Sequence, residues 1–209
     1  MHAYIGADAG ERVLAGQFHR GDVRQIQAAV WFSDLRGFTT LSSQLSSTDL
    51  VATLNAYFGA LAPALAAHGG EVLKYIGDAI LAVFAVRPDR DATQACRDAV
   101  AAAQAASVAL QHLNQVRQAE SLVPLDHGIG LHFGQAEYGN IGSPGRVDFT
   151  VIGRDVNLAS RVEGRAANYT TAVGDSGRCR PRRRSRLAVA WGIRTQRHCR
   201  PARGFCGWQ

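Results

Sequence analysis

The stretch VWFSDLRGFTT, residues 30–40, leads an apolar run into a carboxylate and then a glycine. Residues 28–32 predict a strand, and the polar residues from Thr39 to Ser43 predict the start of a helix. Asp34 therefore stands at the end of a buried strand. Because an unpaired buried charge is costly, we expect this carboxylate to be solvated, paired or bound to a metal.

A second carboxylate lies in GEVLKYIGDAILAVF, residues 70–84, where two β-rich runs flank Gly77 and Asp78. This pattern predicts a hairpin with Asp78 at its turn. A turn beside the strand end would bring Asp34 and Asp78 into one site, and two oxygen ligands with few His or Cys nearby suit Mg²⁺ or Mn²⁺ better than Zn²⁺. The alternative is that Asp34 only caps the helix and Asp78 only serves the turn.

Groups that could bind an anionic ligand lie close to both carboxylates in the sequence. The backbone N–H groups of Gly37, Phe38 and Thr39, at the start of a helix, could bind phosphate. Lys74 is the only lysine in a chain that uses arginine at its other 22 basic positions. A compact ammonium four residues before Asp78 suggests a binding role, and the alternative is an ordinary surface residue of a strand.

The segment VDFTVIGRDVNLASRVEG, residues 147–164, predicts a strand followed by a helix over residues 155–163. Asn157 and Arg161 are four residues apart and share one face of this helix. An amide and a guanidinium that project together can orient a sugar and neutralise a phosphoryl transition state. Thr150 falls on the preceding strand. The alternative is a solvent-exposed polar face without function.

The other elements predict an α+β fold. Helices are expected at residues 47–65 and 91–117, and strands at residues 125–133 and 135–141. The first of these helices carries an apolar stripe and should end by the glycine pair at 69 and 70. The stripe comprises Leu50, Leu54, Phe58, Leu61 and Leu65. This order of elements suggests a sandwich in which one face of the sheet is covered by helices.

Four motifs resemble the catalytic domain of the class III nucleotide cyclases: FSDLRGFT, EVLKYIGDAILAVF, YGNIG and DFTVIGRDVNLASR. The resemblance runs from about Ala28 to Glu163, and it is greatest to the bacterial adenylate cyclase subset with Thr before VIG. It implies a ferredoxin-like α+β core of order βααββαβ, dimerised head to tail, with active sites shared between two chains. The C-terminal strands of such a domain are expected to be missing or replaced here.

The resemblance also implies a role for each site residue. Asp34 and Asp78 would hold two Mg²⁺ or Mn²⁺ ions together with the carbonyl of Leu35. Lys74 and Thr150 would contact adenine. Asn157 would orient the ribose and Arg161 would stabilise the transition state. At one position the chain departs from the family: Asp126-His127 stand where a phosphate-binding Arg is often found. His132 is expected to be a packing residue.

The implied function is that of an adenylate cyclase, which converts ATP to 3′,5′-cyclic AMP and pyrophosphate. Adenine N1 accepts a hydrogen bond from Lys74, whereas guanine presents N1–H there, and guanylate cyclases of the family typically use Glu and Cys at the two base-contacting positions. Two alternatives stay open: a guanylate cyclase, and a catalytically inactive cyclase-like module that serves dimerisation or regulation.

The charge of the chain is divided between a body and a tail. Residues 1–177 hold 12 Arg, one Lys and 17 acidic residues, whereas residues 178–209 hold ten Arg and no acidic residue. The net charge of +6 therefore arises in the tail, so no nucleic-acid partner is expected from the folded body. A nucleic-acid-binding function would rest on the tail alone.

The expected organisation is a linker or remnant of an upstream region at 1–27, a catalytic domain at 28–170 and an irregular Arg-rich tail at 171–209. For the tail, a basic segment without regular structure competes with a shifted reading frame, which we favour. The start lacks a signal pattern, and no apolar run approaches the roughly 20 residues of a membrane span. We therefore expect a cytoplasmic protein without a membrane segment.

Overall fold

The structure is a computed structural model that describes residues 23–143, 146–166 and 186–191. Its central strand is β1 (Val23–Leu35), in which residues 28–31 are buried because both faces of the sheet are covered. The strand begins at Val23 rather than at the predicted Ala28. Residues 23–27 are mostly exposed, so their strand conformation comes from pairing with a neighbouring strand and leaves little hydrophobic signal.

The main sheet has the order β2-β3-β1-β4-β5, and these neighbours are antiparallel. Its other strands are β2 (Glu71–Ile76), β3 (Ala79–Ala85), β4 (His127–Ser143) and β5 (Arg146–Ile152). The predicted hairpin is confirmed as the β2–β3 pair. The predicted order βααββαβ is also confirmed over the segment from β1 to β4.

β4 corrects the prediction of two separate strands on either side of Gly134. It is continuous, pairing with β1 as far as Gly139 and with β5 from Glu137 onward. Gly134 does not break the strand; a Cβ there would collide with the side chain of Asp155. The glycine therefore marks a close approach of another element and not a turn.

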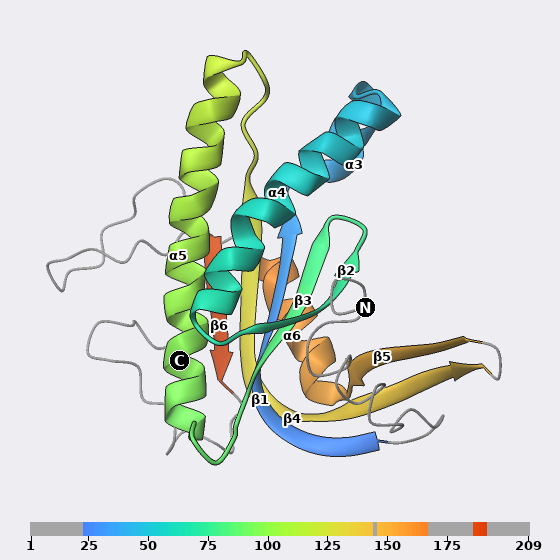
Figure 1. Cartoon of the computed structure of the whole chain (residues 1–209), viewed down its shortest axis with the longest axis vertical. Coiled ribbons are helices and arrows are strands. Elements are labelled where there is room, and N and C mark those ends of the chain that lie inside the picture. The colour runs from blue at the N-terminus through green and yellow to red at the C-terminus, as the bar shows by residue number, and fades with distance from the viewer. Residues whose placement is uncertain (1–22, 144–145, 167–185, 192–209) are drawn as a thin grey trace, which may run out of the picture.

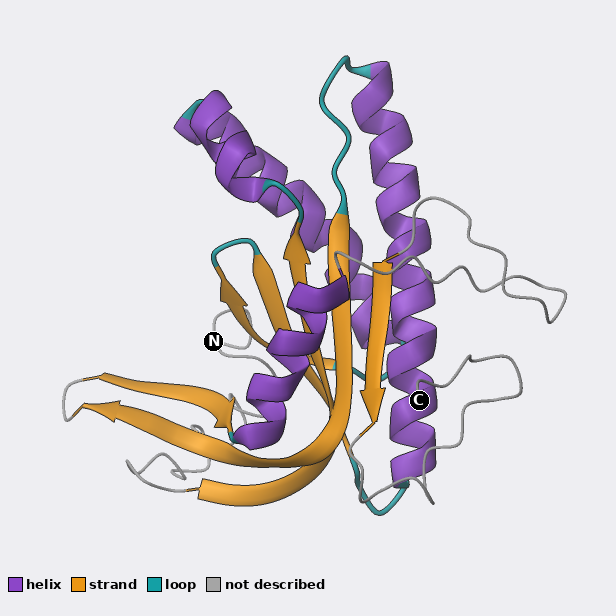
Figure 2. Cartoon of the chain, turned by 180° about the vertical axis from the view of Figure 1, so that it is seen from behind, coloured by secondary structure: helices purple, strands orange, loops and turns teal. Residues whose placement is uncertain are grey.

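The sheet is strongly curled. Figure 1 shows β1 and β4 bending toward the β4–β5 hairpin, and Figure 2 shows the same bend from behind. The hydroxyl of Tyr138 on β4 donates a hydrogen bond to Glu71 on β2 at 3.0 Å, although two strands separate β2 and β4 in the sheet. The curl therefore brings the two ends of the strand order, β2 and β5, into contact.

One face of the sheet packs against α4 (Ser47–Ala67) and α5 (Ala92–Ala119), and the short α3 (Phe38–Gln44) precedes α4. The buried face of α5 is mostly alanine, which allows close packing on the sheet. In α4 the buried series is Thr53, Tyr57, Leu61 and Leu65. Leu61 and Leu65 of the predicted stripe are thus buried, and Leu54 and Phe58 pack against the core while partly buried. The prediction omitted Thr53 and Tyr57, which are more deeply buried.

α4 is also the one helix of the described residues that is long and apolar enough to span a membrane by length and composition. The sequence-based expectation that no such segment exists was thus too strict. Its buried face packs in the core beside Trp31 and Phe84, and a core helix passes the same test. The cytoplasmic location stays a prediction.

α6 (Arg154–Ala166) lies on the opposite face of the sheet, as Figure 2 shows. Val156 and Ala159 pack there against Ile26, Ala28 and Val30 of β1. The prediction of only one covered face was therefore wrong. The alternate apolar residues of β1 on this side form a second core with α6.

The tail contains one described strand, β6 (Arg186–Trp191), which pairs in parallel with β4 between Gly128 and Phe133. This corrects the prediction that residues 171–209 hold no regular element. The six residues RLAVAW are too few to give a periodic signal between Arg-rich flanks, and the free edge of β4 supplies their hydrogen-bonding partner. The reading frame of the tail stays a matter of prediction.

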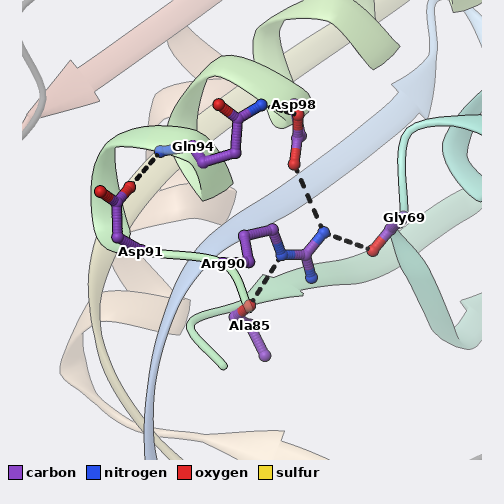
Figure 3. A network of polar contacts seen from close by, with 6 residues as sticks. All are labelled: Gly69, Ala85, Arg90, Asp91, Gln94 and Asp98. Atoms are coloured by element: carbon purple, nitrogen blue, oxygen red, sulfur yellow. Dashed lines mark hydrogen bonds and ion pairs between the residues drawn. The ribbon is translucent and has the colours of Figure 1, made fainter. Parts of the chain in front are cut away.

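The junction between β3 and α5 is fixed by a polar network, drawn in Figure 3. Asp91 caps α5 by accepting a hydrogen bond from the N–H of Gln94 at 2.7 Å. Arg90 donates to the carbonyls of Ala85 and Gly69 at 3.0 and 2.9 Å, and its guanidinium lies 3.6 Å from Asp98. These contacts join the end of α4 to the start of α5.

Candidate functional site

The structure brings the two predicted carboxylates together. Asp34 is the penultimate residue of β1, and Asp78 follows Gly77, whose φ of +62° forms the β2–β3 turn. Burial raises the pKa of Asp78 to about 7, with a hydrogen bond to the Asp34 side chain and the negative charge of Asp34 as further causes. The N–H of Leu35 opposes this rise by donating to Asp78. The side chains of Asp34 and Asp78 therefore lie within hydrogen-bonding reach of each other.

The carboxylate pair fits a divalent cation. Oδ1 of Asp34 is buried and accepts no hydrogen bond from the residues that the structure describes. Such an oxygen needs a partner, and a cation at this point would supply one while relieving the repulsion between the two carboxylates. The described residues contain no cluster of three or more His, Cys, Asp or Glu. Hard oxygen donors suit Mg²⁺ or Mn²⁺.

The turn after Asp34 leaves main-chain donors free of side-chain caps. Gly37 has φ +69° and is the N-cap of α3, with no side-chain cap bond. Phe38 packs its ring against the core and Thr39 is exposed. Gly37, Phe38 and Thr39 thus lie one turn beyond Asp34, and their role as phosphate donors stays a prediction.

Asn157 and Arg161 are exposed on the side of α6 that faces away from the sheet. The buried side of the same helix carries Val156, Ala159 and Glu163. The predicted common face of Asn157 and Arg161 is therefore present, and within one chain it is turned away from the sheet that carries the carboxylates.

Lys74 and Thr150 lie on the two outer strands of the main sheet. Lys74 on β2 is in register with Leu81 of β3, which in turn pairs with Phe32, two residues before Asp34. Thr150 on β5 pairs with Gly139, which pairs with Val23 at the other end of β1. Thr150 and Asp34 are thus separated by about 36 Å of strand path within one chain.

A group of buried polar residues lies beneath the carboxylates, and of its members the sequence had singled out only His127. Nε1 of Trp31 donates to Oγ of Ser33 at 3.0 Å, and the hydroxyl of Tyr57 lies 3.4 Å from Nδ1 of His127. Ser33 also hydrogen-bonds Tyr57, and burial is the largest cause that raises the pKa of Tyr57. Alternation along β1 could have indicated Ser33 as inward-facing, but nothing local indicates its partner.

His127 does not replace the phosphate-binding Arg expected near this position. It is buried, and burial together with the charge of Arg36 lowers its pKa to about 4. A neutral, enclosed imidazole cannot attract a phosphate. His132 is buried as expected, and in addition its Nε2 lies 3.2 Å from Asp155 of α6.

A contact between residues far apart in the sequence joins the turn after β1 to α6. Nη2 of Arg36 lies 2.6 Å from Oε1 of Glu163 and donates to the main-chain carbonyl of Glu163 at 2.9 Å. Burial raises the pKa of Glu163, and Arg36 opposes this rise. The two residues are 127 positions apart, so no sequence pattern links them.

The fold and this carboxylate pair are those of a catalytic domain of the nucleotide cyclase class. Residues 23–178 match the family described as the adenylate and guanylate cyclase catalytic domain. The chain belongs to this family, as the motifs indicated. Catalytic domains of the family generally use divalent metals.

Known proteins similar to this chain include both kinds of cyclase. Adenylate cyclase 1 of Rhizobium meliloti (strain 1021) is 34% identical over 167 residues, which cover 79% of this chain and 24% of that protein. The adenylyl cyclase CyaB from P. aeruginosa has a TM-score of 0.63 at 33% identity, covering 68% of this chain and 74% of that one. The guanylyl cyclase Cya2 has a TM-score of 0.61 at 36% identity, covering 70% and 72%. The chain thus spans about a quarter of the length of the curated relative.

Proposed function

We propose that the chain is an adenylate cyclase that converts ATP to 3′,5′-cyclic AMP and pyrophosphate. The observation that carries the proposal is the meeting of Asp34 and Asp78 around a buried carboxylate oxygen that lacks a donor among the described residues. Membership of the cyclase family and similarity to an adenylate cyclase support it.

Asp34, Asp78 and the carbonyl of Leu35 would hold two Mg²⁺ or Mn²⁺ ions. When bound, these cations lower the pKa of the ribose 3′-hydroxyl and neutralise the triphosphate. Groups of the chain itself bind and orient the substrate. N–H groups of Gly37, Phe38 and Thr39 bind phosphate oxygens near the metals.

α6 supplies the groups that act on the reacting atoms. The amide of Asn157 orients the ribose so that its 3′-oxygen is in line with the α-phosphorus, and the guanidinium of Arg161 neutralises charge that develops on the phosphoryl group. Lys74 donates to adenine N1, and Thr150 accepts from the adenine amine. These groups select the base.

Two chains are required to build one such site. Asn157 and Arg161 face away from the sheet that carries Asp34, and Thr150 lies at the far end of β1 from it. A second copy that docks head to tail brings the α6 face and the base-contacting residues of one chain to the carboxylates of the other. We propose a homodimer with two shared sites.

A guanylate cyclase is the second candidate, because the guanylyl cyclase Cya2 is as similar to the chain as the adenylate cyclases are. The two functions differ in how the base is contacted. Guanine would place N1–H against the Lys74 ammonium, and leaving buried donors mispaired costs about 1–3 kcal/mol each.

The test is an assay of the purified protein with Mn²⁺ and either ATP or GTP, with both cyclic nucleotides quantified. We expect cyclic AMP from ATP and at least tenfold less cyclic GMP from GTP, since a mispairing cost of about 1.4 kcal/mol corresponds to tenfold. Asp34→Ala should lose activity. Comparable cyclic GMP formation would overturn the choice of ATP. No product from either nucleotide, with a folded dimer, would favour the inactive module.

A further inference from the structure

The positively charged side chain of Arg36 lies beside the carboxylate pair. Asp34 is paired across the sheet with Gly128, and directly opposite residues have Cβ atoms about 5 Å apart on one face. A Cβ on Gly128 would collide with Nη2 of Arg36 and with Oε1 of Glu163. The Arg36–Glu163 pair therefore occupies the space over Gly128, next to the side chain of Asp34.

Arg36, Asp34 and Glu163 each have a buried polar atom without a hydrogen-bond partner among the described residues. These atoms are Nε of Arg36, Oδ1 of Asp34 and Oε1 of Glu163, and the last is in ion-pair contact with Nη2 of Arg36 at 2.6 Å. A guanidinium and a carboxylate in this situation would normally form a strong bidentate pair. In the structure the guanidinium is instead in ion-pair contact with the carboxylate of Glu163 and hydrogen-bonds its main-chain carbonyl.

Glu163 is itself fixed in place. Its side chain is only 6% exposed, and α6 lies so close to β4 that a Cβ on Gly130 would come within 2.5 Å of the Glu163 nitrogen. The helix cannot move inward, and the glycine at 128 leaves the room that the ion pair needs. The position of the guanidinium is thus determined by backbone packing and not by a flexible surface contact.

We propose that Glu163 is a positioning residue for the metal site: by binding Arg36, it prevents this guanidinium from pairing with Asp34, so that the carboxylate pair stays available to divalent metal. The inference rests on the proposed function, because it takes Asp34 and Asp78 as the metal ligands. It adds a residue of α6 to the machinery that binds metal in the same chain.

The physical reason is electrostatic. With Glu163 ionised, the charges of the Arg36–Glu163 pair cancel, and the site retains the negative charge of Asp34 and Asp78. Without it, the positive charge of Arg36 beside Asp34 is no longer cancelled and can pair with this carboxylate, which opposes a divalent cation there. Loss of both charges should leave the site as attractive to metal as in the wild type.

The experiment is a double-mutant cycle on the full chain with Mn²⁺ as the probe. Mn²⁺ binding is titrated by electron paramagnetic resonance for the wild type, Glu163→Gln, Arg36→Met and the double variant. We expect Glu163→Gln to raise the Kd for Mn²⁺ about tenfold, Arg36→Met not to raise it, and the double variant to return within about twofold of wild type. Replacement of both members of a buried pair is commonly tolerated, which keeps the double variant folded.

Asp98→Asn is the matched control, because it breaks the Arg90–Asp98 contact of Figure 3, a partly buried ion pair on the other face of the sheet. It should lower thermal stability and leave the Kd for Mn²⁺ unchanged. An unchanged Kd in Glu163→Gln, or a double variant that binds Mn²⁺ as weakly as Glu163→Gln, would overturn this inference and leave the proposed function untouched. If the folded wild type binds no Mn²⁺, or if Asp34→Asn binds it equally well, the metal site of the proposed function fails as well.

Discussion

Tyr57 and His127 show how single residues beneath the site combine burial with polar contacts. Both are almost fully enclosed, and their polar atoms face each other at 3.4 Å. His127 remains neutral because burial and Arg36 oppose its protonation. A residue of this kind stabilises the fold only while it carries no charge.

His127 therefore makes stability depend on pH. Its pKa of about 4 in the folded chain lies below the 6.5 of an exposed imidazole, so the unfolded state binds the proton more readily. The contribution of His127 to stability is constant above about pH 6.5 and falls as the pH decreases from about 6.5 to about 4. At pH 5 we expect a loss of about 2 kcal/mol relative to pH 7 from this residue.

The measurement is urea unfolding of the wild type and His127→Gln at pH 7 and pH 5. The glutamine variant should be less stable at pH 7 but should lose about 2 kcal/mol less than the wild type between the two pH values. Equal losses in both proteins would show that another group causes the pH dependence.

At the scale of elements, α6 lies on a row of small residues of β4. Gly128, Gly130 and Gly134 alternate along the strand on the face toward α6, with His132 between them. A Cβ on Gly130 would come within 2.5 Å of the Ala159 carbonyl oxygen, and backbone atoms cannot move aside as a side chain can. The glycines thus determine how closely α6, with Asn157 and Arg161 on its outer face, approaches the sheet.

Gly130→Ala should separate α6 from β4 and cost about 2 kcal/mol of unfolding free energy, a typical value for overpacking. Gly59→Ala is the matched control. Gly59 is exposed in α4 with nothing within 4 Å of an added Cβ, so the substitution should stabilise the protein by about 0.5–1 kcal/mol. Chemical denaturation of both variants tests this, and a Gly130→Ala protein as stable as the wild type would contradict the close contact.

At the scale of the whole molecule, one chain holds the two halves of the proposed site on surfaces that do not meet. The carboxylates lie at one end of β1, whereas Thr150 is in register with the other end and Asn157 and Arg161 face away from the sheet. A dimer with shared sites predicts that two differently damaged chains can complement each other.

Asp34→Ala and Arg161→Ala should each be nearly inactive as homodimers, the latter because one preorganised donor contributes about 2.7–4 kcal/mol to catalysis. Mixed at random, the two variants should recover about a quarter of wild-type cyclic-AMP formation, since half of the dimers are mixed and each has one intact site. The assay uses co-expressed, differently tagged chains, with equally tagged wild-type dimers as calibration. Verified heterodimers without activity would mean that each site is built within one chain.

The sequence alone predicted the features that depend on neighbouring residues. The strand ending at Asp34, the hairpin with Asp78 at its turn and the helix with Asn157 and Arg161 on one face are all present in the structure. Each follows from alternation, helical spacing or turn residues within a short window. The same motifs sufficed to indicate the cyclase family, which residues 23–178 confirm.

Only the tertiary structure decided which distant groups meet. The single strand β4, the parallel pairing of β6, the burial of Thr53 and Tyr57 and the contact of Arg36 with Glu163 were not predicted. Hydrophobic periodicity indicates that a side chain is buried, but it does not indicate which residues it packs against. Glu163 could be assigned to Arg36 only when the chain path placed α6 over Gly128, because the energy of that contact depends on a distance in space and not on a separation in sequence.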